Sequence, residues 1–317
     1  MTTLPVDRDM LAYLNGLAPL APPDFATWPL ERQRDGWEAL CRATQARRPA
    51  GLLVEDLDVA GTHVRVYRPP GESPMPGVIY AHGGGWTMGS CETHDDICAE
   101  IADQADVVVV SYDYRLAPEH RPPAQLEDGL KVLDWMRSSG RAIGLDPTHV
   151  VGAGDSVGGQ MTAGLALALR DRRLAQLRGL VLIYPALGAD TGTRSYVEQA
   201  NAPGLSSAEM AECLEAFLGP RGAGRWSDPY AVPNTAADVS GLPPTFITVA
   251  AHDPLHDDGT IFHARLKAAG IAVALREEAA LAHSYMRARH ASPVAMDGFR
   301  AIVEAIRHLA HEGMLPG

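Results

Sequence analysis

The chain has 317 residues, of which 46% are hydrophobic and 21% charged, so it is long enough to bury one large sheet core and still carry an accessory element. Its net charge of −12 argues against nucleic acid or an anionic membrane as partner, because both require basic patches that the sequence lacks. No apolar run approaches the roughly 18 residues of a membrane-spanning helix. The N-terminus also lacks the apolar core of a signal peptide, which predicts a cytoplasmic location.

Eight strand-like runs occur along the chain and alternate, after the third, with helical stretches. They cover about residues 52–59, 63–68, 76–81, 107–112, 150–153, 179–183, 245–250 and 273–277. This is the βαβ pattern of a mostly parallel sheet, with antiparallel pairing open for the first strands. The sequence therefore predicts an α/β fold in which helices flank a mostly parallel eight-stranded sheet.

Four cysteines, Cys41, Cys91, Cys98 and Cys213, are scattered along the chain without the C-x-x-C spacing of zinc sites. A scattered cysteine in such a chain usually behaves as a small apolar residue. We therefore expect reduced thiols, no disulfide and no metal site.

A glycine-rich loop follows the third predicted strand, in the stretch Tyr80-Ala-His-Gly-Gly-Gly-Trp86. Consecutive glycines let bare backbone N–H groups turn toward one point, as the oxyanion of a tetrahedral acyl-transfer intermediate requires. Three glycines also suit a merely flexible loop, but flexibility alone does not call for a preceding strand and histidine. We expect the oxyanion donors to be the N–H groups of Gly83, Gly84 and Val157.

A second glycine-framed turn lies within Val150-Val-Gly-Ala-Gly-Asp-Ser-Val-Gly-Gly159 and holds Ser156 between a predicted strand and a predicted helix. It fits the G-x-S-x-G nucleophile elbow, whose serine sits on a sharp turn where side chains at Gly154 and Gly158 would collide with neighbouring backbone. An isolated match is more often an ordinary strand-to-helix turn, and the upstream glycine loop changes that balance. A dinucleotide-binding interpretation fails because residue 157 is valine where that motif needs its third glycine.

A serine nucleophile needs a base and an orienting acid, which should follow it in the order acid, histidine. Asp253 comes directly after the seventh predicted strand and His283 shortly after the eighth. The carboxyl ends of parallel strands line one edge of a sheet, so Ser156, Asp253 and His283 can converge there. Asp257 and Asp258 are competing acids, but they precede an apolar helical pattern and are interpreted as helix N-terminal charges.

Four stretches together carry a resemblance to a known family: His82–Trp86, Tyr114–Asp128, Gly154–Gly159 and Asp253–Gly259. The chain resembles bacterial members of the hormone-sensitive lipase family of α/β-hydrolase esterases, over about residues 50–290. The resemblance implies the α/β-hydrolase fold and the same division of roles: Ser156 as nucleophile, Asp253 as acid, His283 as base, and Gly83, Gly84 and Val157 as oxyanion donors.

Three departures from the family pattern bear on selectivity. Val157 replaces the common alanine, His256 stands where arginine is frequent, and Ser284-Tyr285 replaces the frequent glycine and phenylalanine. None of them removes a catalytic group. The extra bulk of Val157 is expected to narrow the pocket beside the oxyanion hole.

Two regions fall outside the strand–helix alternation, residues 1–48 and about 188–240. In the second, Ser206 and Glu209 make a capping box before an apolar pattern. The resemblance implies that both regions form a helical cap on a catalytic domain of residues 49–317. Within this arrangement we expect the substrate pocket to involve Trp86, Phe217 and Leu255.

The predicted activity is hydrolysis of a small-molecule ester with a short- to medium-chain acyl group, through an acyl-enzyme and without a cofactor. Amides, lactones or one specific acetylated metabolite stay open as substrates, because fold alone does not settle them. A non-catalytic ligand receptor on the same fold is disfavoured because His283 is present. Whether the chain is a monomer or a homodimer is also open.

Overall fold

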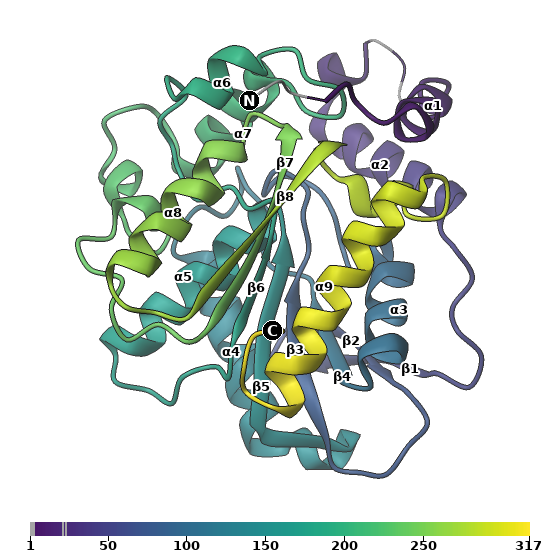
Figure 1. Cartoon of the computed structure of the whole chain (residues 1–317), viewed down its shortest axis with the longest axis vertical. Helices are drawn as coiled ribbons and strands as arrows, with labels where there is room; N and C mark the ends of the chain where they lie inside the picture. Colours follow the sequence, from purple (N-terminus) through teal and green to yellow (C-terminus); the bar gives the residue numbers. More distant parts are fainter. Residues whose placement is uncertain (1–3, 21, 23) are drawn as a thin grey trace.

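A central eight-stranded sheet organises the chain in the computed structural model, which describes residues 4–20, 22 and 24–317 (Figure 1). The strands are β1 (Leu53–Val59), β2 (Thr62–Arg68), β3 (Met75–Ala81), β4 (Val108–Tyr112), β5 (Leu145–Asp155), β6 (Leu180–Ile183), β7 (Thr245–His252) and β8 (Val273–Ala282). The α-helices are α1 (Arg8–Gly16), α2 (Leu30–Thr44), α3 (Asp95–Ala105), α4 (Ala124–Ser139), α5 (Val157–Asp171), α6 (Arg194–Glu198), α7 (Ser207–Leu218), α8 (His256–Ala268) and α9 (Pro293–His311).

The strand order is β1-β2-β4-β3-β5-β6-β7-β8. β2 pairs antiparallel with both β1 and β4, and every pair from β4–β3 to β7–β8 is parallel. Strands that are covered on both faces have continuous apolar sequences, because side chains on both faces are buried. All five residues of β4 are buried in this way. The predicted mostly parallel sheet of eight strands is confirmed, and the pairing left open for the first strands is antiparallel.

Helices cover both faces of the sheet. α3 and α9 lie on one face, where α9 contacts β3, β5 and β6, while α4, α5 and α8 lie on the other face. Each face buries its own apolar cluster, which is expected for the three-layer arrangement of an α/β protein. The layers hold the carboxyl ends of the parallel strands at one edge of the molecule.

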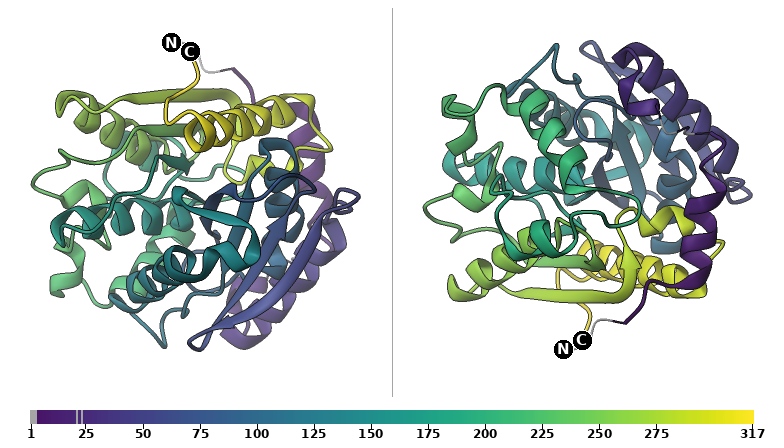
Figure 2. Two further views of the ribbon diagram at one scale, coloured as in Figure 1. Left: turned by 90° about the horizontal axis from the view of Figure 1, so that it is seen from below. Right: turned by 90° about the horizontal axis from the view of Figure 1, so that it is seen from above.

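Two further groups of helices lie beyond that edge. α1 and α2 come from the N-terminal segment, and α6 and α7 come from the connection between β6 and β7. Figure 1 shows both groups at the top of the molecule, and Figure 2 (right) looks down on them from that end. α7 begins at the predicted capping box, in which the Ser206 side chain accepts from the Glu209 N–H and the Glu209 carboxylate accepts from the Ser206 N–H. Within the described residues, no helix is long and apolar enough to cross a membrane.

Candidate active site

Ser156 occupies the sharp turn between β5 and α5, with φ 56° and ψ −121°. The turn is tight enough that a Cβ added at Gly158 would lie 1.9 Å from the Ala81 carbonyl oxygen, and one at Gly154 would lie 2.5 Å from the Gly158 backbone. Real side chains cannot make such contacts, so both positions require glycine. The strained turn presents the Ser156 hydroxyl at the carboxyl edge of the sheet, as the sequence predicted.

The three expected triad residues meet there. The His283 Nε2 lies 3.0 Å from Ser156 Oγ, and the His283 Nδ1 lies 2.7 Å from Asp253 Oδ2. A carboxylate only accepts, so the proton of a neutral His283 sits on Nδ1 and leaves Nε2 free to accept from the serine hydroxyl. Asp253 is completely buried, and its other oxygen accepts from the Leu255 N–H at 2.9 Å. This order of contacts matches that of an activated serine nucleophile.

The competing acids face other partners. Asp257 accepts from the Ser195 N–H at 2.9 Å, and Asp258 accepts from the Gly188 N–H at 2.8 Å. Both lie in the first turn of α8, as predicted. Burial raises the pKa of Asp258 to about 7, and the nearby Asp253 adds to that shift. Neither acid is the residue that contacts His283.

The glycine loop differs from the sequence-based expectation at one position. The Gly83 N–H donates to Asp155 Oδ1 at 3.1 Å, so this donor is engaged within the protein and the expectation for Gly83 is wrong. Gly84 and Gly85 have φ values of +130° and +60° and line the cavity beside Ser156. A Cβ at Gly84 would lie 2.1 Å from the Met88 carbonyl oxygen, which shows how closely this loop folds on itself.

Asp155 holds the loop against the elbow. Its carboxylate accepts from the Tyr80 hydroxyl at 2.8 Å and the Gly83 N–H, and it lies 3.3 Å from the His94 Nε2. Burial works against ionisation of Asp155, yet the charge and hydrogen bond of His94, the Arg287 guanidinium and the Tyr80 hydroxyl hold its pKa well below the usual range. The residue before the nucleophile is therefore a buried anion that fixes the glycine loop.

A cavity of about 490 Å³ opens over Ser156 and His283, a volume within the range of small-molecule sites. Two segments distant in sequence contribute to its wall. The N-terminal segment supplies Phe25, Leu30, Gln33 and Trp37, and the region of α7 supplies Leu205, Glu209, Met210, Glu212, Cys213 and Ala216. The sequence predicted that helices from both regions lie over Ser156, but it did not identify which of their residues line the cavity, because periodicity shows that a helix face is apolar without showing what it faces.

The three side chains expected to contact substrate lie elsewhere. Trp86, Phe217 and Leu255 are buried together in a cluster behind the cavity wall, where the Trp86 and Phe217 rings stack with centroids 4.2 Å apart. The Trp86 Nε1–H donates to Gln160 Oε1 at 2.8 Å. Val157 belongs to the same cluster, so its extra methyl groups pack against the protein interior. The expectations that these four side chains shape the pocket are contradicted by their position.

Residues 78–287 match a family model described as the alpha/beta hydrolase fold. The chain belongs to the α/β-hydrolase family. It is 39% identical over 299 residues to the carboxylesterase NlhH of Mycobacterium tuberculosis, covering 87% of this chain and 91% of that protein. It is also 34% identical over 248 residues to an ethyl acetate hydrolase of Pseudomonas putida, covering 77% of each chain.

Solved α/β-hydrolases agree with this assignment. The esterase of Pyrobaculum calidifontis superposes with a TM-score of 0.87 at 31% identity, over 96% of this chain and 99% of that one. The relatives confirm the resemblance to bacterial esterases of the hormone-sensitive lipase family.

Proposed function

We propose that this α/β-hydrolase cleaves carboxylic esters through an acyl-enzyme formed on Ser156. His283 takes the proton of the Ser156 hydroxyl through Nε2 while the oxygen attacks the ester carbonyl, and it then returns that proton to the leaving alcohol. Asp253 keeps His283 in the required tautomer and stabilises the imidazolium that forms. Water, activated by His283 in the same way, releases the acid and restores the hydroxyl. The continuous Ser156–His283–Asp253 hydrogen-bond chain is the observation that carries this proposal.

The oxyanion would be held by the N–H groups of Gly84, Gly85 and Val157. The choice replaces Gly83 with Gly85, because the Gly83 N–H is already bonded to Asp155. Val157 is the first residue of α5, so its N–H is one of those at the helix N-terminus that have no acceptor within the helix. The positive end of the helix dipole lies at the same place and favours a negative charge there. Preorganised donors of this kind commonly supply the largest single electrostatic stabilisation in acyl transfer.

The proposed substrates are esters with short- to medium-chain acyl groups. The relatives at 39% and 34% identity are named as a carboxylesterase and an ethyl acetate hydrolase, which supports the ester-hydrolase class. α1, α2, α6 and α7 serve in this proposal as a cap that excludes water from the cavity. A cytoplasmic location stays a prediction from the sequence, and the choice between monomer and homodimer stays open.

A p-nitrophenyl ester series from acetate to palmitate, measured on the wild type and on Ser156→Ala, tests the proposal. We expect kcat/KM to be highest for acyl chains of roughly two to eight carbons, because the cavity volume is that of a small-molecule site. Ser156→Ala should lose about 10³-fold or more in kcat on every ester while remaining folded by circular dichroism. A variant that kept a tenth of the wild-type rate would disprove the nucleophile, and a kcat/KM that rose up to palmitate would disprove the substrate range.

A further inference from the structure

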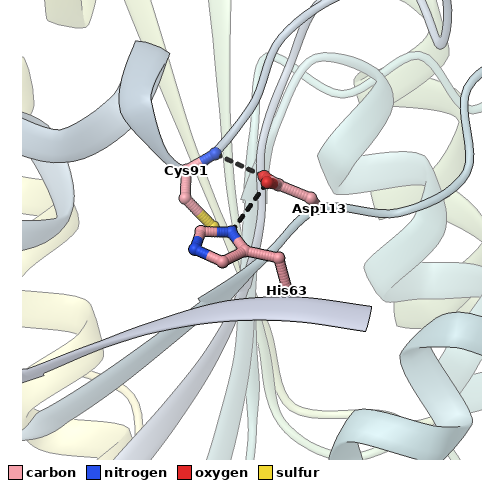
Figure 3. Close-up of side chains that lie close together, drawn as sticks. All are labelled: His63, Cys91 and Asp113. Atoms are coloured by element: carbon pink, nitrogen blue, oxygen red, sulfur yellow. Dashed lines mark hydrogen bonds and ion pairs between the residues drawn. The ribbon is translucent and has the colours of Figure 1, made fainter. Parts of the chain in front are cut away.

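A second cluster of chemically active side chains lies away from the catalytic cavity, where β2, the end of β4 and the loop before α3 meet. His63 Nδ1 lies 2.8 Å from Asp113 Oδ2, and the Cys91 N–H donates to Asp113 Oδ1 at 2.6 Å (Figure 3). One ring nitrogen of His63, Cys91 Sγ and one oxygen of Asp113 all lie within 4.8 Å of one another. The three donors therefore converge on one small volume, although 50 residues separate the first from the last in sequence.

The donor set suits zinc. A thiolate, an imidazole and a carboxylate are the ligand types that Zn²⁺ takes, and its bond lengths place neighbouring ligand atoms about 3.3–3.6 Å apart in a tetrahedral site. The His63 Nδ1–Asp113 Oδ2 separation of 2.8 Å is somewhat shorter than that range, and no two of the three donor atoms lie more than 4.8 Å apart. Small side-chain rotations would bring the three donors to zinc-binding distances.

The surroundings of His63 resemble those of a zinc-bound histidine. Its second nitrogen, Nε2, lies 3.3 Å from Asp56 Oδ1, and Arg65 holds the Asp56 carboxylate with two hydrogen bonds of 2.7 and 3.0 Å. Metal-bound histidines usually donate their other N–H to a carboxylate, which fixes the tautomer and raises the basicity of the ligand nitrogen. This second carboxylate is an observation independent of the three donors.

An ion can also reach the cluster. The side chains of His63 and Asp113 are 42% and 35% exposed, whereas Cys91 is completely buried behind them. None of these three residues lines the cavity over Ser156. Ion binding here would therefore be separable from ester hydrolysis.

We propose that His63, Cys91 and Asp113 form a zinc-binding site with a water as the fourth ligand. The thiol proton of Cys91 leaves to solvent as the Zn–S bond forms. A neutral His63 that carries its proton on Nδ1 changes tautomer, so that Nε2 carries the proton and donates a hydrogen bond to Asp56 while Nδ1 binds the metal. The site was not expected from cysteine spacing because its ligands come from three separate segments. All four cysteines are free, as predicted, so Cys91 is available as a ligand.

The site has a structural consequence for the glycine loop. Cys91 lies two residues after Gly89, where a Cβ would lie 2.5 Å from the Gly83 carbonyl oxygen and 2.7 Å from the His82 ring. A zinc ion bound to Cys91, His63 and Asp113 would link the segment just after Gly89 to β2 and to the end of β4. Because the ion binds the folded chain, zinc should raise the melting temperature.

Titration with Co²⁺ tests the proposal without reference to activity, because a thiolate bound to Co²⁺ gives a charge-transfer absorption that imidazole and carboxylate ligands do not give. We expect the metal-free wild type to develop this band with one Co²⁺ per chain and to lose it when Zn²⁺ is added. Cys91→Ser should abolish the band. His63→Ala, a change at a half-exposed position that leaves the core intact, should weaken binding at least tenfold, and Asp56→Asn by about 10- to 100-fold.

Two matched controls should bind Co²⁺ as the wild type does. His149→Ala removes a comparable surface pair, in which His149 Nδ1 lies 2.7 Å from Asp146 Oδ2 with no cysteine in the set, and Cys41→Ser removes a different buried thiol. The proposal is overturned if the wild type gives no thiolate band, if the band survives Cys91→Ser, or if His149→Ala weakens binding as much as His63→Ala.

Discussion

Ser156 adopts a backbone conformation that suits glycine better than serine. Its φ of 56° and ψ of −121° are maintained by the surrounding structure, in which the Ser156 N–H donates to the Ile183 carbonyl and the Ser156 carbonyl accepts from the Ala186 N–H. Non-glycine residues in such regions cost about 1–3 kcal/mol each and persist where the environment over-determines them. The turn therefore carries a conformational cost at the residue that we propose as the nucleophile.

Comparing Ser156→Gly with Ser156→Ala isolates that strain, because both variants lack the hydroxyl. Glycine relieves the positive φ but loses more chain entropy on folding, a penalty of about 0.5–1 kcal/mol. We expect Ser156→Gly to be the more stable by about 1 kcal/mol in urea unfolding. If Ser156→Ala proved the more stable, the turn would store no appreciable strain.

Asp253→Asn should lower kcat by about 10³- to 10⁴-fold, because an amide at this position favours the wrong histidine tautomer. Asp257→Asn is the matched control: it lies four residues on and contacts Ser195 instead of His283. It should keep its rate within a few-fold. Steady-state kinetics on one acetate ester ranks the two variants, and the reverse ranking would place the orienting acid at Asp257.

At the residue scale, the triad was predictable and the details around it were not. Ser156, Asp253 and His283 each follow a recognisable strand, and parallel strands bring their carboxyl ends together. Gly83 was assigned wrongly because its partner, Asp155, lies 72 residues away and the glycine spacing gives no sign of it. Trp86 was assigned to the pocket although its ring stacks on Phe217 in the interior. Spacing does not show which way a side chain points.

At the element scale, the N-terminus of α8 is hydrogen-bonded to the segment that leads into α6. Asp258 accepts a hydrogen bond from the Gly188 N–H, shortly after β6, and Asp257 accepts one from the Ser195 N–H at the start of α6. The Ser195 hydroxyl in turn donates to the Pro254 carbonyl at 2.6 Å, immediately after Asp253. The start of α8 therefore holds the segment before α6 in place relative to Asp253.

Asp258→Asn should change how stability depends on pH. The pKa of Asp258 is raised from 3.8 to about 7 by burial, so the folded state binds this proton more tightly than the unfolded state. The contribution of Asp258 to the free energy of unfolding of the wild type is fully present below about pH 4 and is lost as the pH rises through about 7. Asparagine has no proton to lose, so the stability of Asp258→Asn relative to the wild type should increase over this window, by at most about 4 kcal/mol.

Urea unfolding at pH 4 and pH 8 measures that change. Asp257→Asn is again the control: burial raises the pKa of Asp257, but hydrogen bonds from Ser195 and His256 lower it overall to below its ordinary value of 3.8. The stability that depends on Asp257 therefore changes mainly below pH 4, and the difference between Asp257→Asn and the wild type should change little between pH 4 and pH 8. A stability difference between Asp258→Asn and the wild type that stayed constant over this range would show that Asp258 titrates normally in the folded protein.

The eight strands were predicted in the right places, with differences at their ends. β8 continues to Ala282, five residues beyond its expected end, through Glu278 and Ala279, whose residue types are uncommon in strands. Pairing with β7 overrides this local preference and carries the chain directly to His283. β5 likewise begins at Leu145 although Asp146 and Pro147 interrupt the apolar pattern.

At the scale of the whole molecule, the N-terminal segment that lines part of the cavity is hydrogen-bonded to residues that follow the glycine loop. Arg34 on α2 donates to the Thr87 and Ala117 carbonyls at 2.7 and 3.0 Å and pairs with both oxygens of Glu119. α2 is thereby held beside the glycine loop, where Trp37 closes part of the cavity. The sequence predicted that this region forms helices, but contacts between residues so far apart in sequence cannot be inferred from hydrophobic periodicity.

The central claim, that Ser156 is the nucleophile of an acyl-transfer site, is tested most directly by covalent trapping. A p-nitrophenyl alkylphosphonate presents a tetrahedral phosphorus that resembles the intermediate and bonds irreversibly to an activated serine. Peptide mass spectrometry of the inactivated protein should find one phosphonyl group per chain, located on Ser156, in proportion to the activity lost. Inactivation with the group on another residue, or with Ser156 unmodified, would contradict the claim.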